Sequence, residues 1–306
     1  MILGQELAKL LGQMDIDTIY VRGVDKPILQ HLALKILLYG WGLKEGPHYG
    51  KTVGEEFGIT ILTGRGDSLA THSFSKDGKR ITLKYPETPL FIIDLSLWDR
   101  HSQDEKRKLV SQISISLSTL RTYLWDYNLS INHSNKEFEE MFAKMGFSNR
   151  SRRDVEPPKS TVVLDPYAEA NASESLIRSV DCFILGGIVD DSGWKYATTK
   201  LTELVGYDFP RVKITLRGSR VGVPDRLNKI ISIVMRVRNG MSLEESIIEE
   251  QSSADKFLRL LRETTINKDL EGNASWLKAS ERVKERVRKT LSQTLPESSS
   301  SLQSNS

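Results

Sequence analysis

The chain has 306 residues, of which 39% are hydrophobic and 27% charged, and its mean hydropathy is -0.34. These values are typical of a globular protein and exclude a collagen, a coiled-coil rod and a wholly disordered chain. The 43 basic residues exceed the 40 acidic ones by only 3, so net charge alone does not require an acidic partner. A single cysteine, Cys182, excludes an internal disulfide and a multi-cysteine zinc site.

Membrane-directing segments are not predicted. The richest apolar window, residues 28–43, is interrupted by Gln30, His31 and Lys35, and it falls short of the ~18 apolar residues of a membrane span. The N-terminus has no basic stretch before its apolar residues, unlike a signal peptide. We therefore expect a cytoplasmic protein with no membrane association.

The first block, residues 1–87, mixes helical and strand patterns. Its second helix is predicted over residues 27–39, with Pro27 just inside the start and Gly40 just after the end. A glycine-rich loop is expected over residues 40–54, and Asp77-Gly78 between two alternating runs predicts a hairpin turn. The block is predicted to be a small α+β domain.

The second block, residues 88–240, alternates between strands and helices. Five strand-then-helix units predict an α/β domain with a parallel sheet, whose ligands bind beyond the carboxyl ends of the strands. A polar stretch, residues 149–159, is expected to be a surface loop or linker. The predicted strands cover residues 90–95, 129–132, 161–164, 182–185 and 212–216.

The third block, residues 241–295, is predicted to be a short helical extension. Ser242 and Glu245 have the spacing of a capping box at the start of its first helix, and a later helix is expected over residues 274–291. The serine-rich tail, residues 296–306, is expected to be disordered.

Two motifs of other functions are present only superficially. Gly46-Pro-His-Tyr-Gly-Lys-Thr has three residues between its glycines, whereas a phosphate-binding P-loop has four, and Pro47 lacks the backbone N–H that would bind phosphate. The five histidines share no helical face and have no neighbouring cysteine, so no metal site is predicted.

Two glycine-containing loops in the second block lie where ligands are expected. The first, residues 185–193, contains Gly186, Gly187 and Asp190 directly after a strand. Paired glycines let a ligand approach the backbone, although a plain strand-to-helix turn explains the same pattern. The second loop, residues 216–228, leads from the last strand of the block into its last helix. Neither loop has the Gly-x-Gly-x-x-Gly spacing of a dinucleotide site.

Basic residues concentrate at the second loop. Residues 211–238 contain eight basic residues and the single acid Asp225, a local excess of seven. A cluster several times the whole-chain excess is typical of a protein that binds a phosphate backbone. Solvated helix faces remain the alternative explanation, above all for residues 278–289, where acids are interleaved.

Five segments together resemble one family, the SPOUT-class methyltransferases that act on N1 of the purine at position 9 of transfer RNA. The resemblance covers about half of the chain, and the separate N-terminal and C-terminal parts are similar to the archaeal branch. The matching segments are Phe91-Ile-Ile-Asp-Leu-Ser, Leu109-Val-Ser-Gln-Ile, Val162-Val-Leu-Asp, Ile184-Leu-Gly-Gly-Ile-Val-Asp and Val221-Gly-Val-Pro-Asp-Arg-Leu-Asn.

The resemblance implies a SPOUT-type parallel sheet that ends in a trefoil knot, and a monomer with S-adenosyl-L-methionine as cofactor and tRNA as substrate. No metal and no obligate protein partner are implied. Asp190 matches the catalytic group. The implied cofactor-binding residues are Leu164, Leu185, Gly186, Gly187, Val189, Leu216, Gly218, Gly222, Val223 and Leu227. The substrate-binding residues, from the resemblance and the basic cluster, are Asp94, Gln112, Asp225, Arg211, Lys213, Arg217 and Arg220.

The target base is open between adenine and guanine. The guanine-specific pattern has Thr-Val-Asn where this chain has Gly222-Val-Pro, a departure that favours adenine. The alternatives are another SPOUT methyltransferase, acting on a ribose 2′-hydroxyl or on ribosomal RNA, and a non-catalytic RNA-binding protein.

Overall fold

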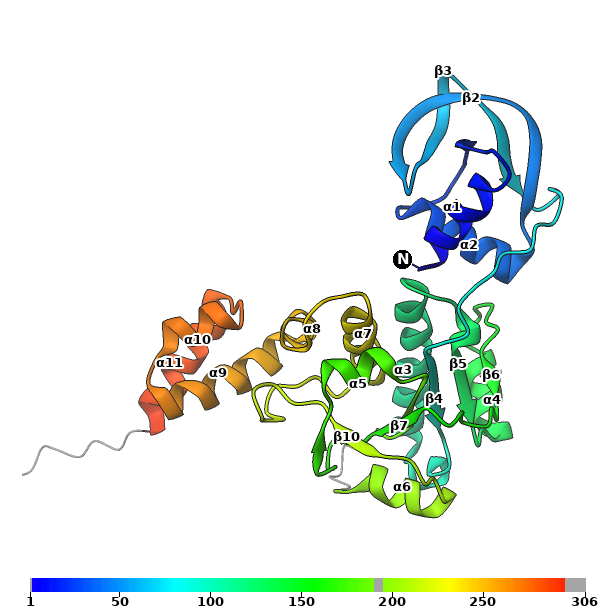
Figure 1. The fold of residues 1–306 in the computed structure, drawn as a ribbon. Coiled ribbons are helices and arrows are strands. Elements are labelled where there is room, and N and C mark those ends of the chain that lie inside the picture. Colours follow the sequence, from blue (N-terminus) through cyan, green and yellow to red (C-terminus); the bar gives the residue numbers. More distant parts are fainter. Residues whose placement is uncertain (1, 190–194, 295–306) are drawn as a thin grey trace, which may run out of the picture. The chain divides into compact units, whose positions relative to one another are not determined.

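The structure is a computed structural model that describes residues 2–189 and 195–294 (Figure 1). It has an α/β fold with a central parallel sheet of seven strands. The chain separates into two compact units, which we describe one at a time. The first unit comprises residues 1–168 and 179–212, and the second comprises residues 169–178 and 213–306.

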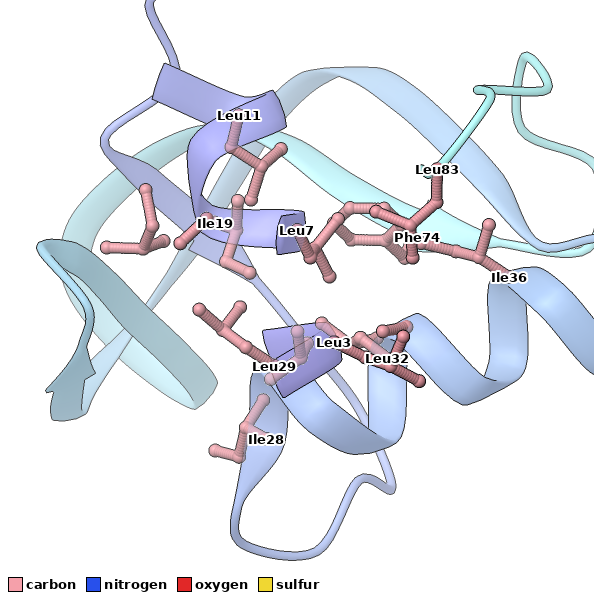
Figure 2. Packing of buried hydrophobic residues seen from close by; sticks show 14 of the residues in the cluster. Leu3, Leu7, Leu11, Ile19, Ile28, Leu29, Leu32, Ile36, Phe74 and Leu83 are labelled. Carbon is pink, nitrogen blue, oxygen red and sulfur yellow. The ribbon is translucent and has the colours of Figure 1, made fainter. Parts of the chain in front are cut away.

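The N-terminal part of the first unit has two helices and a three-stranded sheet of order β1-β3-β2. Its elements are α1 (Ile2–Gly12), β1 (Thr18–Tyr20), α2 (Ile28–Tyr39), β2 (Gly42–Glu56) and β3 (Ile59–Ser75). Leucines at helical spacing on α1 pack against α2 and the sheet, and Figure 2 shows Leu3, Leu7 and Leu11 pointing into this core. The predicted small α+β arrangement is therefore present, whereas its boundary at residue 87 stays a prediction.

The glycine-rich segment 40–54 is a strand rather than the loop that we expected. Most of it belongs to β2, which pairs with β3 as a long antiparallel hairpin. The hairpin reverses at Phe57-Gly58, where both residues have positive φ, as a two-residue turn of this type requires. The turn predicted at Asp77-Gly78 follows β3 instead, and residues 80–88 form no strand.

Glycines at the hairpin's bend allow two backbones to meet. A Cβ added to Gly66 would lie 2.5 Å from the backbone of Gly50, so a larger residue at position 66 would force the strands apart. The P-loop-like glycines therefore have a structural explanation. The Tyr20 and His48 rings stack here, with 5.6 Å between their centroids.

The central sheet has the strand order β6-β5-β4-β9-β7-β10-β8. Neighbouring pairs from β6 to β10 are parallel, so the carboxyl ends of these strands lie at one edge. All five predicted strands are present, and the polar stretch 149–159 adds β6. The strands are β4 (Leu90–Asp94), β5 (Leu129–Asn132), β6 (Arg152–Arg153), β7 (Thr161–Leu164), β8 (Ala170–Asn171), β9 (Cys182–Gly186) and β10 (Arg211–Lys213).

The sheet is buried because its strands carry nearly continuous apolar residues. Leu90, Ile92, Val163, Cys182 and Ile184 form one buried cluster. The helical segments associated with this region are η1 (Trp98–Arg100), α3 (Gln103–Arg121), η2 (Asp126–Asn128), α4 (Lys136–Ala143), α5 (Glu174–Ser179) and α6 (Ala197–Val205). Within the described residues, no helix is both long enough and apolar enough to cross a membrane.

The second unit is mostly helical. Its helices after residue 213 are α7 (Leu227–Arg238), α8 (Leu243–Glu250), α9 (Ser253–Asn267), α10 (Leu270–Trp276) and α11 (Glu281–Thr294). The prediction of one helix over 274–291 was wrong in extent. The helical conformation is interrupted between α10 and α11, where Lys278 has a positive φ of 50°. Pro224 lies before the helix, since α7 begins at Leu227. Ser242 caps α8 by accepting the Glu245 N–H, as predicted.

Candidate active site

The carboxyl edge of the sheet brings together polar groups from distant parts of the first unit. Asp94 at the end of β4 is in register with Asn132 of β5 and with Gly186 of β9. Because these strands are parallel and adjacent, the loops that follow them begin side by side. The edge therefore combines a buried carboxylate, an amide and a glycine pair.

Asp94 is the most deeply buried of these groups, with none of its surface exposed. Its Oδ1 accepts the Ser96 N–H at 2.8 Å, and its Oδ2 accepts the Tyr207 hydroxyl at 2.6 Å and His133 Nδ1 at 2.9 Å. Burial, followed by this hydrogen bond to Asp94, raises the pKa of Tyr207, so the phenol stays protonated and keeps donating. The carboxylate is thus fully occupied by internal donors.

Of Asp94 and His133, only the His133 side chain reaches solvent. It follows β5, has a positive φ of 55°, and its side chain is 45% exposed. The Asp154 carboxylate fixes its backbone by accepting the His133 N–H at 2.7 Å. Since the Asp94 carboxylate can only accept at this contact, Nδ1 carries a proton. Sequence reasoning missed His133, because it considered the histidines only as metal ligands.

The glycine pair after β9 packs tightly against β4. Gly187 N donates to Asp94 O at 2.8 Å, and a Cβ on Gly187 would lie 2.5 Å from Leu95 and 2.8 Å from that carbonyl. A Cβ on Gly186 would lie 2.7 Å from Ile188. A larger residue at position 187 would therefore displace the segment, because the Asp94 carbonyl belongs to the backbone, whereas at position 186 the Ile188 side chain could move aside. Asp190, the predicted catalytic residue, comes three residues later and lies outside the described residues.

His101 holds the last described residue before Asp190. Its Nε2 accepts the Val189 N–H at 3.1 Å, and its Nδ1 lies 3.3 Å from Trp98 O. Because a carbonyl only accepts, the imidazole is neutral, with its proton on Nδ1. His101 is 5% exposed and Val189 is 8% exposed, so this contact is shielded from water. His101 was likewise not predicted as a site residue.

A network of polar side chains fixes Trp98, whose carbonyl contacts His101. Glu137 accepts hydrogen bonds from Lys106 at 2.6 Å, from Gln103 at 2.9 Å and from Trp98 Nε1 at 2.9 Å. These hydrogen bonds, led by the one from Lys106, lower the pKa of Glu137 to about 2. Trp98 is thereby fixed, and with it the carbonyl that selects the His101 tautomer.

Asp165 continues the edge directly after β7. It is fully buried, accepts the Thr199 hydroxyl at 2.8 Å and the Tyr167 N–H at 2.9 Å, and pairs with Arg211 at 3.5 Å. Arg211, predicted to bind RNA, is thus partly neutralised within the first unit. The predicted cofactor residues in this unit, Leu164, Leu185 and Val189, are buried.

In the second unit, residues 216–223 form two consecutive tight turns. Leu216 and Ser219 exchange backbone hydrogen bonds of 2.9 and 3.0 Å around Arg217-Gly218, both with positive φ. A second turn is closed by the Val223 N–H, which donates to Arg220 O at 3.0 Å. Apart from its chain neighbours, none of the described residues has an atom within 4 Å of a Cβ added to Gly218, so these residues leave open space beside this backbone.

The remaining predicted residues differ in exposure. Leu216 and Leu227 are buried, Gln112 is half-buried on α3, and Asp225 is exposed. Arg217 donates two hydrogen bonds to Glu244, at 3.0 and 3.1 Å, and lies over the Trp276 ring.

The basic cluster is also less free than its charge count suggests. Lys229 and Arg236 both pair with Glu250 at 2.9 Å. Burial works to raise the pKa of Glu250, but hydrogen bonds from Ser232, Lys229 and Arg236 hold it below its ordinary value. Part of the local excess of seven is therefore neutralised by acids elsewhere in the second unit.

A family profile described as the tRNA (adenine(9)-N1)-methyltransferase N-terminal domain matches residues 1–75. The chain is 38% identical over 295 residues to a tRNA (adenine(9)-N1)-methyltransferase of Sulfolobus acidocaldarius, which covers 95% of this chain and 99% of that protein. It is also 38% identical over 192 residues to a tRNA (guanine(9)-/adenine(9)-N1)-methyltransferase of Thermococcus kodakarensis, over 59% of this chain and 52% of that protein.

Among solved structures, the crystal structure of Sulfolobus acidocaldarius Trm10 in complex with S-adenosylhomocysteine is similar with a TM-score of 0.81. The two sequences are 34% identical, and the match covers 95% of this chain and 99% of that one. Sequence and structure therefore agree over nearly the whole length of both proteins. The chain belongs to the tRNA (adenine(9)-N1)-methyltransferase family, the Trm10 proteins.

Proposed function

We propose that this protein transfers a methyl group from S-adenosyl-L-methionine to N1 of adenine at position 9 of tRNA. The observation that carries the proposal is the likeness to a tRNA (adenine(9)-N1)-methyltransferase over 95% of the chain. Because a relative with 38% identity is a guanine(9)-/adenine(9) enzyme, guanine is the second candidate base.

The residues present fit a bound methyl donor. In the second unit the described residues leave open space beside Gly218, and in the first unit Leu164, Leu185 and Val189 are apolar. When bound, S-adenosyl-L-methionine supplies an electrophilic methyl group on a sulfonium. We propose that the predicted cofactor residues contact it: Leu164, Leu185, Gly186, Gly187 and Val189 of the first unit, and Leu216, Gly218, Gly222, Val223 and Leu227 of the second.

The chain's own residues would position the base and balance charge. Neutral adenine has a free lone pair on N1, so no proton need leave before attack, and the methylated base is cationic. A carboxylate at Asp190 would stabilise that developing charge. For guanine, whose N1 carries a proton, the same carboxylate would have to accept it. Asp94 would influence the base through His133, which is exposed, rather than directly.

Further features of the family resemblance complete the proposal. We propose a trefoil knot in the central domain, a monomer, a cytoplasmic location, and RNA binding by residues 1–87 together with Arg211, Lys213, Arg217 and Arg220. Gln112 and Asp225 are proposed to lie near the target base. Because duplex-rich RNA is recognised through its backbone and shape, affinity should fall steeply with salt.

The test is methyl transfer to tRNA transcripts with labelled donor, followed by mass spectrometry of nucleosides. The proposal predicts 1-methyladenosine from a transcript with adenine at position 9. A 2′-O-methylated nucleoside would favour another SPOUT activity, and binding of tRNA without any transfer would favour a non-catalytic RNA-binding protein. Light scattering of the eluted protein would show whether it is a monomer.

A further inference from the structure

The helices after residue 243 contact the turns of residues 216–223 at two points. At the first turn, Glu244 of α8 accepts two hydrogen bonds from Arg217 and a third, at 2.7 Å, from Trp276 Nε1 of α10. The Arg217 guanidinium lies 3.8 Å from the centre of the Trp276 ring. One carboxylate and one indole thus fix the side chain that flanks Gly218.

At the second turn, Gly222 is contacted by α9 and by Gln251, the residue that follows α8. Gln251 Nε2 donates to Gly222 O at 2.8 Å, and both residues are buried. Gly222 has a φ of 74°, and a Cβ there would lie 2.6 Å from Arg259 Cβ and 2.6 Å from Asp255 O. The helix therefore contacts the loop so closely that only glycine fits.

Arg259 extends this contact along the loop. It is fully buried, and its Nη1 donates to Val221 O at 3.3 Å and, at 3.5 Å, to Ser219 O. Its charge is balanced by Glu263 at 2.9 Å, whereas its Nη2 has no hydrogen-bond partner among the described residues. Burying an incompletely satisfied guanidinium is costly, and an apolar side chain would fill the same space more cheaply. Arg259 donates hydrogen bonds to loop carbonyls, which an apolar residue could not do.

We propose that α8, α9 and α10 form a clamp that holds residues 216–223 in the shape that binds the methyl donor, with Gln251 and Arg259 as positioning residues. The clamp rests on the proposed function, because it assumes that this loop contacts S-adenosyl-L-methionine. The C-terminal helices would then contribute to cofactor affinity, in addition to any contact that they make with RNA.

The test uses the full chain and the variant Gln251→Met, which keeps the side chain's length but removes the donor to Gly222 O. Losing one buried hydrogen bond to the loop should raise the dissociation constant for S-adenosylhomocysteine about fivefold. Binding is measured by titration calorimetry, tRNA affinity by filter binding, and backbone hydrogen exchange by mass spectrometry. We expect faster exchange in residues 216–223, with tRNA affinity within about twofold of the wild type.

Two further variants separate the clamp from general destabilisation. Gly222→Ala should loosen the same residues more strongly, because its Cβ overlaps the α9 backbone. Thr265→Ala is the matched control, since Thr265 lies on α9, is exposed, and its hydroxyl donates to Leu261 O of the same helix rather than to the loop. It should leave both loop exchange and S-adenosylhomocysteine affinity unchanged.

Each result that would contradict the proposal refutes a different part of it. Unchanged loop exchange in Gln251→Met and Gly222→Ala would refute the clamp. Faster exchange with wild-type affinity for S-adenosylhomocysteine would refute its role in cofactor binding. A wild-type chain that fails to bind S-adenosylhomocysteine would instead refute the proposed function, and the clamp's role in binding with it.

Discussion

Replacing His101 tests whether the segment before Asp190 must be held in place. His101→Leu removes the acceptor of the Val189 N–H while filling similar space. Leaving a buried donor without its partner costs about 1–3 kcal/mol. Because Val189 is 8% exposed, water cannot replace the imidazole unless the segment moves. The expected fall in kcat/KM is therefore about 5- to 150-fold, as every 1.4 kcal/mol is tenfold.

Amide variants at the same position sharpen this prediction. The Oε1 of His101→Gln reaches about as far as Nε2, so this variant should recover much of the activity. The shorter His101→Asn mimics Nδ1 and should resemble His101→Leu. His31→Gln is the control, since His31 contacts Asp25 O in the N-terminal part of the chain. Single-turnover rates with saturating tRNA give the comparison, and equal rates for the leucine and glutamine variants would refute the reasoning.

Three other predictions concern charge and protonation. Asp190→Asn should lower the single-turnover rate moderately on an adenine-9 tRNA without altering its pH profile. On a guanine-9 tRNA the rate should fall about 10²–10⁴-fold, and the rise of the rate with increasing pH should disappear. A full rate on both would exclude Asp190 from the mechanism. Burial raises the pKa of Cys182 to about 12 from 9.0. The free energy of unfolding should therefore fall by up to about 1.4 kcal/mol per pH unit as the pH rises from 9.0 to about 12. Denaturant titrations of Cys182→Ala should show a smaller decline over this range. Lys213→Gln should lower the salt slope of tRNA binding by about 1. Arg217→Gln, whose guanidinium already binds Glu244, should chiefly lower the melting temperature; equal salt effects for the two variants would contradict this distinction.

The sheet was predictable from sequence because its strands are buried runs that end in recognisable loops. Leu90–Asp94 and Cys182–Gly186 are nearly all apolar, and a helical pattern follows each. The hairpin of β2 and β3 was not predictable from sequence, because Gly42–Glu56 is rich in glycine and polar residues. Its strand conformation comes from pairing with β3 over its whole length, a long-range contact that local propensity does not encode.

The candidate site was predictable only in part. Gly186 and Gly187 were interpreted as letting a ligand approach the backbone, and in the structure Leu95 lies against Gly187. His101 and His133 carry no comparable signal, since each acquires its role from a partner 88 or 39 residues away. A lone histidine acquires an oriented imidazole only once the fold supplies a carboxylate or carbonyl at the right distance.

Arg217 shows a different limit of sequence reasoning, which counted its charge without knowing that Glu244 pairs with it. Its bidentate contact with Glu244 connects residues 27 apart and could not be inferred from either segment alone. Charge counted along a chain is therefore an upper limit on the charge that a surface offers.

The measurement that tests the central claim most directly uses two tRNA transcripts that differ only in nucleotide 9, adenine in one and uracil in the other. Each is incubated with the protein and S-adenosyl-L-methionine, digested with a nuclease, and mapped by mass spectrometry. We predict one added methyl group on the base at position 9 of the first transcript and none on the second. Equal methylation of both transcripts, or a methyl group at another position, would contradict the assignment.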